Sequence, residues 1–372
     1  MNIAINARVL NERKGGPYRY TINILRELSK LDRTNTYYIL LYDDYDFDFE
    51  LPKNYKIIIK KIKSKVYFDY IYLPLFSKSH NIDVWFFPKN TFSPLIKGKK
   101  VPVFHDIVYF EKDLNFREFK FFDNLHHSIM IPINGKIADI NIAVSEFTAS
   151  RMKELLHIPE DKIKIIKEGV EKKFTVIKDK MRLEHVKERL GLSLPFFFYS
   201  GSLSPRKNML AVLHAFQKVQ KEIPHVMYYT GGYSWLDNEV ISYIENNNLK
   251  SRVIKLGYVS DEDLVVLYNL ADCYLYPSIY EGFGLPILEA QACGCPVITS
   301  NVSSCPEVAG EGALLVDPRN VDEISRAMLK IVKNENFRNS IVKRGLENVK
   351  KYSWHKCAKE LLNTFEYIAN NL

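Results

Sequence analysis

Residues 273–299 read CYLYPSIYEGFGLPILEAQACGCPVIT, which predicts a strand, a glycine-rich loop, a helix and a second strand. The first strand is the apolar run Cys273–Tyr276, and the second is Pro296–Thr299. Between them, Leu285–Cys293 has a helical pattern with Pro286 in its first turn, where the missing N–H of proline costs no hydrogen bond. A helix that connects two short strands is typical of a parallel α/β sheet.

The same alternation of short apolar runs and amphipathic stretches continues on both sides of this unit and forms two series. Strands of the first series are expected at Ile3–Ala7, Tyr37–Tyr42, Lys56–Ile59, Val84–Phe87, Val101–Phe104 and Ile140–Val144. Further strands of the second series are expected at Phe196–Ser200, Val226–Thr230, Val253–Leu256 and Ala313–Val316. Helices are expected at Tyr18–Leu31, Asn208–Val219, Asp261–Leu270, Val321–Lys333, Phe337–Val349 and Trp354–Ala369. Two such series predict an α/β protein built from two doubly wound, Rossmann-like domains.

The length of the chain agrees with two domains. It has 372 residues, and a single core rarely grows past about 250–300 residues. The charged stretch Glu171–Arg189 has few apolar residues, so we expect the joint there. The predicted organisation is a first domain at 1–175, a second domain at 176–352 and a terminal helical segment at 353–372.

Composition argues against several classes of protein. No apolar run reaches the ~18–20 residues needed to span a bilayer, and the N-terminus is better explained as a buried strand than as a signal peptide. The five cysteines are an odd count, which favours reduced thiols and a cytoplasmic protein. Cys293 and Cys295 have no second cysteine pair, so we interpret them as small buried residues rather than zinc ligands.

The net charge of +8 is distributed unevenly. Residues 1–170 hold 27 Lys and Arg against 21 Asp and Glu, or +6, and the rest of the chain holds 25 against 23, or +2. A basic first half suits an anionic membrane surface or a phosphorylated substrate, and it equally suits ordinary solubility. No nucleic-acid-binding motif accompanies the charge, so binding to DNA or RNA is not expected.

Ligands of open parallel sheets bind beyond the carboxyl ends of the strands, so the residues just after each strand are the candidate site. Gly15 and Gly16 follow the first strand and open a helix, where glycine lets backbone N–H groups approach an anion. Gly201 follows the strand Phe196–Ser200, and Arg206 and Lys207 come soon after it. Two cations at a helix start oppose the helix dipole, and a bound diphosphate would remove that conflict.

Glu281 and Glu289 flank the loop and helix start of the 273–299 unit. The backbone N–H groups expected to point out of this helix start belong to Gly282, Phe283, Gly284 and Leu285. A continuous helix would separate the two carboxylates by ~12 Å, which exceeds the ~5–9.5 Å of glycoside hydrolases. A loop followed by a helix instead makes them separate receptors, one for a donor sugar and one for a ribose.

Two further groups follow first-series strands. His105 and Asp106 come directly after Val101–Phe104, where the histidine suits contact with sugar hydroxyls or proton transfer. Asp43–Asp48 contains spaced aspartates that a metal-dependent sugar transferase would use to hold a divalent cation. Because Arg206 and Lys207 can already neutralise the charge of a diphosphate, we interpret the aspartates as an acidic surface turn and expect no metal cofactor.

These residues resemble glycosyltransferase family 4, the retaining transferases of the two-domain GT-B fold. The resemblance covers nearly the whole chain and is most specific at the E-x7-E element, Glu281 to Glu289. Its other segments are 6–8 with 15–20, 103–106, 143–148, 168–170, 206–207 and 306–310. At 168–169 the family usually carries Asn-Gly, and this chain has Glu168 instead.

The resemblance implies two domains facing across a cleft, a nucleotide diphosphate sugar as donor, retention at the anomeric carbon and no required metal. It implies that Glu281 lies near the donor sugar, Glu289 near the ribose and Tyr258 near the nucleobase, and that the last helix returns to the first domain. The subgroup with His105-Asp106 resembles mannosyltransferases of surface polysaccharide assembly, which favours mannose from GDP-mannose and a saccharide or lipid-linked acceptor. His105, Arg206, Lys207 and Glu281 are therefore the candidate catalytic residues.

Other functions stay open from the sequence. A nucleotide-sugar epimerase of related fold and a sugar-binding protein without chemistry are the alternatives. A docking surface for an anionic membrane is also a hypothesis, since basic residues alternate with aromatic ones in two first-domain stretches. Its residues are Lys60, Lys61, Ile62, Lys63, Lys65, Val66, Tyr67 and Phe68, with Phe116, Arg117, Phe119, Lys120, Phe121, Phe122, His126 and His127.

Overall fold

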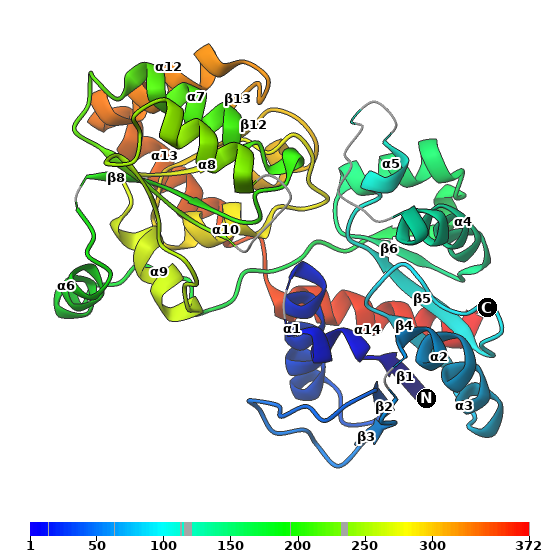
Figure 1. Ribbon diagram of the computed structural model, residues 1–372. Helices are drawn as coiled ribbons and strands as arrows, with labels where there is room; N and C mark the ends of the chain where they lie inside the picture. The colour runs from blue at the N-terminus through cyan, green and yellow to red at the C-terminus, as the bar shows by residue number, and fades with distance from the viewer. Residues whose placement is uncertain are drawn as a thin grey trace. The chain divides into compact units, whose positions relative to one another are not determined.

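The computed structural model of the chain describes residues 1–13, 15–62, 64–111, 114, 121–193, 195–231 and 237–371, without the side chains of 121–124 and 237. It divides into two compact units. The first contains most of the chain up to Gly169 together with Ser353–Leu372, and the second contains Val170–Tyr352 (Figure 1). The C-terminal segment therefore belongs to the first unit, although the whole second unit separates it in sequence.

The first unit is built on a parallel sheet with strand order β3-β2-β1-β4-β5-β6-β7. Its strands are β1 (Asn2–Asn6), β2 (Thr36–Leu41), β3 (Tyr55–Ile59), β4 (Val84–Phe87), β5 (Lys99–Phe104), β6 (Asn141–Ala143) and β7 (Ile163–Ile165). Its helices are η1 (Arg8–Glu12), α1 (Gly16–Leu31), α2 (Lys65–Tyr67), η2 (Phe68–Tyr72), α3 (Leu73–Ser79), η3 (Val108–Phe110), α4 (Phe121–Ile137), α5 (Glu146–Leu156), η5 (Glu160–Lys162) and α14 (Trp354–Asn371).

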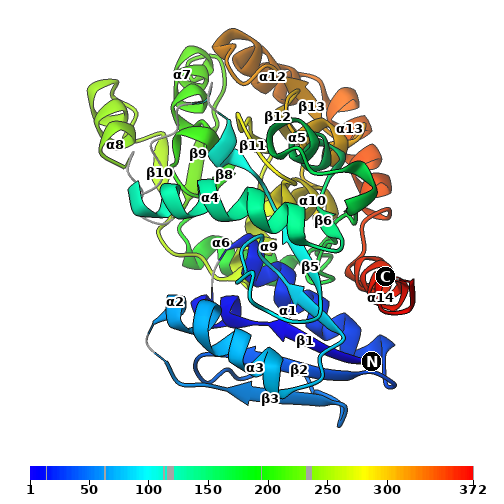
Figure 2. The ribbon, with the colours of Figure 1, turned by 90° about the vertical axis from the view of Figure 1, so that its right-hand side faces the viewer.

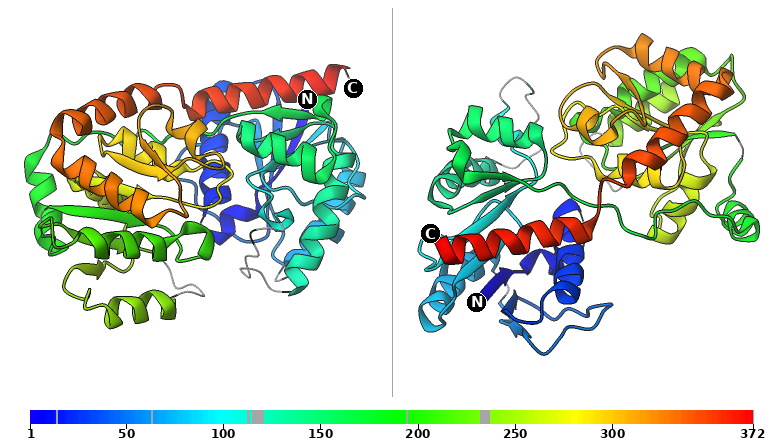
Figure 3. Two further views of the ribbon diagram at one scale, coloured as in Figure 1. Left: turned by 90° about the horizontal axis from the view of Figure 1, so that it is seen from above. Right: turned by 180° about the vertical axis from the view of Figure 1, so that it is seen from behind.

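The alternation of side chains along β4 decides which helices cover each face of this sheet. Trp85 points to the face covered by α3, where its ring lies 6.2 Å from that of Phe76. Phe86 points to the opposite face, where its ring lies 5.4 Å from that of Phe365 in α14. Figure 2 shows α2 and α3 running beside strands β1 to β3. Figure 3 shows α14 along the first unit, where it packs on α1, β4 and β5.

The second unit repeats the design with strand order β10-β9-β8-β11-β12-β13, again parallel. Its strands are β8 (Phe196–Ser200), β9 (Val226–Thr230), β10 (Val253–Lys255), β11 (Cys273–Tyr276), β12 (Val297–Ser300) and β13 (Leu314–Val316). Its helices are α6 (Lys180–Arg189), η6 (Pro205–Lys207), α7 (Met209–Val219), α8 (Asp237–Asn246), α9 (Asp261–Leu270), α10 (Leu285–Ala292), α11 (Cys305–Ala309), α12 (Val321–Lys333) and α13 (Glu335–Val349). One core joins α7, α8 and α12 to the sheet, while α10 contacts α9 and α13 (Figure 1).

The prediction of two doubly wound α/β units is confirmed, and most strand and helix positions agree within one or two residues. Strand β7 was not predicted, because three residues between short turns carry too little periodicity. The predicted helix at Asn208 is two elements: η6 ends at Lys207, Asn208 is left-handed with φ +64°, and α7 begins at Met209. All five cysteines are buried and free, as expected.

In both sheets the order of the strands reverses at the centre. From β1 the chain moves outward to β2 and β3 and then returns to β4 on the other side. From β8 it moves to β9 and β10 and then returns to β11. Ligands of open α/β sheets bind at such switch points, beyond the carboxyl ends of the two central strands. The residues after β1 and β4, and after β8 and β11, are therefore the ones to examine.

Candidate active site

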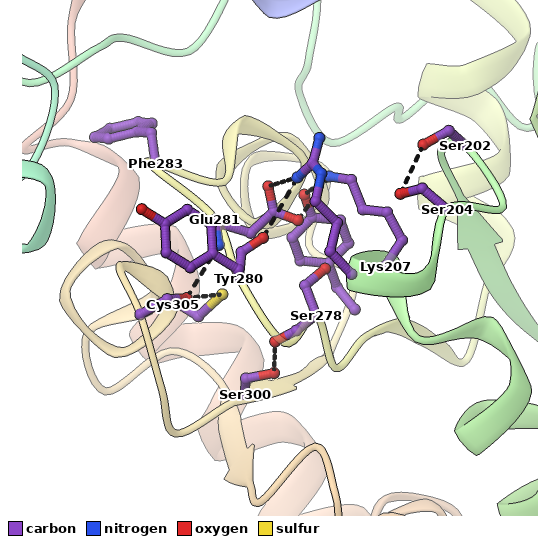
Figure 4. Close-up of polar contacts among 12 residues, drawn as sticks. Ser202, Ser204, Lys207, Ser278, Tyr280, Glu281, Phe283, Ser300 and Cys305 are labelled. Atoms are coloured by element: carbon purple, nitrogen blue, oxygen red, sulfur yellow. Dashed lines mark hydrogen bonds and ion pairs between the residues drawn. The ribbon is translucent and has the colours of Figure 1, made fainter. Parts of the chain in front are cut away.

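The switch point of the second unit carries a cluster of one buried glutamate and two cations (Figure 4). Arg206 and Lys207 lie in η6, after β8, and Glu281 lies in the loop after β11. Lys207 Nζ donates to Glu281 Oε1 at 2.6 Å, and Arg206 NH1 donates to Glu281 Oε2 at 3.2 Å. Residues about 75 positions apart in sequence meet here because β8 and β11 are neighbours in the sheet.

Burial and charge act against each other in this cluster. Burial lowers the pKa of the Lys207 ammonium, and the Glu281 carboxylate only partly offsets that effect. Burial raises the pKa of Glu281, but the charges of Lys207 and Arg206 outweigh it, so the pKa of Glu281 lies below its ordinary value. Lys207 also donates to the hydroxyl of Tyr276 at 2.6 Å. Two cations share one carboxylate, which leaves this position with a net charge of +1 and suits it to an anion.

The loop from Glu281 to Gly284 is fixed by hydrogen bonds before α10 begins. The Ser304 hydroxyl donates to the carbonyl oxygens of Glu281 at 3.0 Å and Phe283 at 2.8 Å. Gly284 precedes the helix with φ +104°, a conformation that favours glycine. The helix starts at Leu285, with Pro286 in its first turn. Glu281 is thus in the loop and Glu289 in the helix, as the loop-and-helix interpretation expected.

Glu289 lies within a buried network of hydroxyl groups. Its Oε2 accepts a hydrogen bond from the hydroxyl of Tyr268 at 3.4 Å, and that hydroxyl is 3.2 Å from the hydroxyl of Ser200 at the end of β8. Only 5% of Glu289 is exposed. A carboxylate among hydroxyls at the carboxyl end of a strand can accept hydrogen bonds from a diol such as a ribose.

The other predicted donor-binding residues of the second unit follow β8 and β10. Gly201 has φ +132°, and a Cβ placed on it would meet no atom within 4 Å, so there is open space beside its backbone. Gly231, which the sequence interpretation missed, lies so close that a Cβ there would be 2.0 Å from the carbonyl oxygen of Gly201. Tyr258 is 95% exposed, so it is available to a ligand and contributes little to the core.

In the first unit, His105 follows β5 and is held at both ring nitrogens. Its Nδ1 lies 3.0 Å from Glu168 Oε1, and its Nε2 lies 2.9 Å from the carbonyl oxygen of Pro88. Glu168, the residue that departs from the family pattern, is only 3% exposed and is the acidic partner of His105. The sequence marked Glu168 as unusual but not as this partner.

Gly15 and Gly16 form the start of α1. Gly15 has φ +84° and precedes the helix, and a Cβ on Gly16 would meet no atom within 4 Å. The backbone of this turn is therefore accessible, as an anion-binding turn requires. Asp106 is a local capping residue whose Oδ1 accepts from the backbone N–H of Val108 at 3.4 Å.

The acidic stretch 43–48 pairs with basic side chains. Asp44 pairs with Lys61, and Asp48 pairs with Arg26 at 2.7 Å. Within the described ranges, no group of three or more His, Cys, Asp or Glu side chains is placed to hold a metal ion.

Comparison with known proteins identifies the class to which this fold and these motifs belong. Among solved structures, a glycosyltransferase from Rickettsia africae superposes with a TM-score of 0.75 at 20% identity, over 100% of this chain and 99% of that one. WaaG, a glycosyltransferase involved in lipopolysaccharide biosynthesis, superposes with a TM-score of 0.74 at 14% identity, over 98% and 99%. The fold is therefore GT-B, the fold of two-domain glycosyltransferases.

Sequence comparison then gives the family. The family described as glycosyl transferases group 1 matches residues 181–348. O-antigen chain mannosyltransferase B of Escherichia coli is 32% identical over 289 residues, 75% of this chain and 73% of that protein. Serotype-specific mannosyltransferase WbdA of Escherichia coli is 31% identical over 282 residues, 73% of this chain but 34% of that protein. The chain belongs to the group 1 glycosyltransferases, which confirms the expected resemblance, and it is a glycosyltransferase.

Proposed function

We propose that this glycosyltransferase moves a hexose, mannose from GDP-mannose, to a saccharide or lipid-linked acceptor during assembly of a surface polysaccharide. The observation that carries the proposal is the cluster of Arg206, Lys207 and Glu281 at the switch point of the second unit. Mannose is favoured because the relatives with 32% and 31% identity are named O-antigen chain mannosyltransferase B and serotype-specific mannosyltransferase WbdA.

The proposed roles follow from charge. As the glycosidic bond to the donor breaks, the departing nucleoside diphosphate gains negative charge, and groups that bind it more tightly at that stage lower the barrier. Arg206, Lys207 and the N-terminus of α10 supply positive charge for it. Glu281 is proposed to contact the donor sugar and Glu289 the ribose, and Tyr258 is proposed to flank the base.

Retention at the anomeric carbon is part of the proposal. A same-face, substrate-assisted route is the working mechanism, in which the leaving diphosphate takes the proton of the acceptor hydroxyl. His105 is proposed to bind a sugar hydroxyl at Nε2 in exchange for the carbonyl oxygen of Pro88, while Glu168 holds the ring at Nδ1. No metal is proposed to take part, because Arg206, Lys207 and the helix N-terminus can hold the diphosphate themselves.

The test is a transfer assay with GDP-mannose, UDP-glucose and UDP-N-acetylglucosamine, each with and without oligomannoside acceptors. Transfer from GDP-mannose that requires the acceptor and keeps the α configuration by NMR supports the proposal. Isomerisation of the donor without acceptor would identify an epimerase, and binding without any change would identify a sugar-binding protein. Arg206→Ala and Lys207→Ala should lose most of the transfer, whereas Lys218→Ala, in an exposed ion pair of the same unit, should retain it.

We further infer that the first unit docks on an anionic membrane. One face of α4 exposes Leu125, Ile129, Ile133 and Ile137, which are 39–50% exposed and recur every four residues. A second exposed apolar row runs from α2 to α3 and consists of Tyr67, Ile71 and Leu75. It lies beside α4, because the hydroxyl of Tyr70 is 2.7 Å from His126 Nε2. Apolar rows on a basic domain suit the interface of anionic lipids.

The residues that the sequence suggested for membrane docking have different environments in the structure. Phe68 is fully buried and belongs to the core, so that part of the hypothesis is wrong, while Val66 and Tyr67 are exposed. Lys61 and Lys65 are more than half exposed but pair with Asp44 and Glu12. Lys63, Phe116, Arg117, Phe119 and Lys120 lie outside the described residues, and the side chains of Phe121 and Phe122 are not described. No described helix is long and apolar enough to cross a bilayer.

Sedimentation with liposomes tests membrane docking. Binding to vesicles with 30 mol% (about one lipid in three) anionic lipid should weaken with salt and with Ile129→Glu plus Ile133→Glu. Ile241→Glu, at a similarly exposed isoleucine of α8, is the matched control and should bind as the unaltered protein does. Equal binding by both variants would contradict the inference.

A further inference from the structure

The first unit has its own small cavity at its own switch point. The cavity lies beyond the carboxyl ends of β1 and β4, the two strands between which the sheet order reverses. Its lining includes Asn6, Arg8, Phe87, Pro88, Lys89 and Thr91. In sheets of this kind such a position is where ligands bind, and apart from Gly15 and Gly16 after β1 the proposed donor-site residues follow other strands.

Two cations that line this cavity, Arg8 and Lys89, meet a third, Lys65, at the carboxylate of Glu12. Arg8 NH1 and Lys65 Nζ both donate to Glu12 Oε1, at 3.1 and 2.8 Å, and Lys89 Nζ donates to Glu12 Oε2 at 3.3 Å. Arg8 also forms a two-pronged pair with Asp69, at 3.1 Å from Nε and 3.0 Å from NH2. Three cations against two carboxylates leave the cluster with a net charge of +1.

The burial of these charges makes a purely structural role expensive. The side chains of Arg8 and Asp69 are only 12% and 11% exposed. Burial and the neighbouring charges of Arg8 and Lys65 lower the pKa of Lys89, although Glu12 acts in the opposite direction. The attraction between buried charges offsets little more than the free energy lost when they leave water, so apolar contacts would stabilise these loops at least as well. A preformed, partly exposed set of cations is instead what an anionic ligand requires.

The arrangement parallels that of the second unit. There, one glutamate holds an arginine and a lysine at the switch point, and here Glu12 holds Arg8 and Lys89 in the same way. The cavity is also adjacent to His105, because the carbonyl oxygen of its lining residue Pro88 is 2.9 Å from His105 Nε2. A ligand whose anionic group is bound by these cations would therefore have its neighbouring hydroxyls on the side of the cavity where Pro88 and His105 lie.

We propose that the cation cluster beside this cavity binds a phosphate group carried by the acceptor, through Arg8, Lys89 and Lys65. The proposal rests on the proposed function, since it specifies the acceptor of that reaction. A phosphate offers a planar face of oxygens to the guanidinium of Arg8 and point acceptors to the two ammonium groups. The phosphate can come from a lipid pyrophosphate that carries the growing saccharide or from a free sugar phosphate.

Binding is tested first without any sugar transfer, by calorimetric titration with inorganic pyrophosphate. Arg206→Ala with Lys207→Ala removes both cations of the second-unit cluster, so the binding that this double variant retains reports on the first unit. Lys89→Met in that background should weaken the remaining binding at least about tenfold, the factor expected for one charge-assisted contact. Lys30→Gln, which removes an ion pair with Glu27 elsewhere in the unit, should leave it unchanged. Lys65→Gln, at a more exposed position, gives a second measurement if Lys89→Met folds poorly.

The acceptor preference is tested with matched pairs. Mannose 6-phosphate and a short-chain lipid pyrophosphate mannoside are each compared with the same compound lacking phosphate. In each pair the phosphorylated compound should have the lower KM, and Lys89→Met should remove that difference. The pair with the larger difference in KM identifies the source of the phosphate. Pyrophosphate binding that Lys89→Met leaves intact, or no preference within either pair, overturns the proposal. If the unaltered protein binds pyrophosphate as expected but transfers no sugar to any acceptor, the proposed function is refuted and the phosphate site is not.

Discussion

Glu281→Gln tests whether the glutamate of the second unit holds two cations ready for a diphosphate. The change keeps the size of the side chain and removes its charge, so Lys207 and Arg206 lose their shared counter-ion. Both oxygens of the carboxylate are used, at 2.6 and 3.2 Å, and Glu281 is only 6% exposed. Breaking a buried pair by removing one partner costs about 3–5 kcal/mol, because the other charge stays buried without compensation.

We expect the lower end of that range. Arg206 is partly exposed, and Lys207, whose pKa is already lowered by burial, can release its proton. In a domain of this size, 1 kcal/mol corresponds to about 2–4 °C, so a loss of ~3 kcal/mol lowers the melting temperature of the second unit by about 6–12 °C. A nucleoside diphosphate should restore much of this loss, since its phosphates supply the missing negative charge.

The assay is thermal unfolding with and without GDP, combined with calorimetric measurement of the GDP dissociation constant. GDP should raise the melting temperature of Glu281→Gln more than that of the unaltered protein, and sugar transfer should be lost. Glu222→Gln, which breaks an exposed ion pair with Lys333, is the matched control and should cost no more than about 1 kcal/mol. A Glu281→Gln protein that melts normally, or that binds GDP more weakly than the unaltered protein, would refute the reasoning.

Three further predictions concern stability and chemistry. Burial raises the pKa of Asp32, but hydrogen bonds, of which that from Tyr37 is the strongest, lower it from 3.8 to about 2. The ionised carboxylate should therefore contribute about 2 kcal/mol to the free energy of unfolding above pH 4, and this contribution should be lost as the pH falls towards 2. The free energy of unfolding by denaturant should be larger at pH 6 than at pH 2.5, and Asp32→Asn should reduce that difference by about 1.5–2 kcal/mol, since other carboxylates such as Glu12 and Glu281 supply the rest. Gly169→Ala should lower the free energy of unfolding by ~3 kcal/mol or more, because the added Cβ would lie 2.1 Å from the backbone nitrogen of Trp354. Gly16→Ala is the control: its Cβ would meet no atom within 4 Å, so it should unfold like the unaltered protein. Sugar transfer should persist in EDTA, and a loss of activity that manganese restores would revive a metal role for the aspartates at 43–48.

The periodicity of the sequence was sufficient to predict the class of fold. Alternating apolar runs and amphipathic stretches are local patterns, and each reports its own strand or helix without reference to distant residues. The motif from Glu281 to Glu289 could be interpreted in the same way, because a glycine, a proline and a helix start lie within nine residues. Strand β7 was missed for the complementary reason that three residues contain too short a pattern.

The partners of the candidate site residues were decided only by the tertiary structure. Lys207 and Glu281 are 74 positions apart, His105 and Glu168 are 63 apart, and Glu12 and Lys89 are 77 apart. No local pattern connects such pairs, because they meet only when the sheet brings the ends of distant strands together: β8 and β11 are neighbours, as are β1 and β4, while β6 lies between β5 and β7. The order of the strands, with its reversals between β1 and β4 and between β8 and β11, therefore determined which charges converge. The sequence determined which residues follow each strand, and the pairing of strands determined which of those residues share a site.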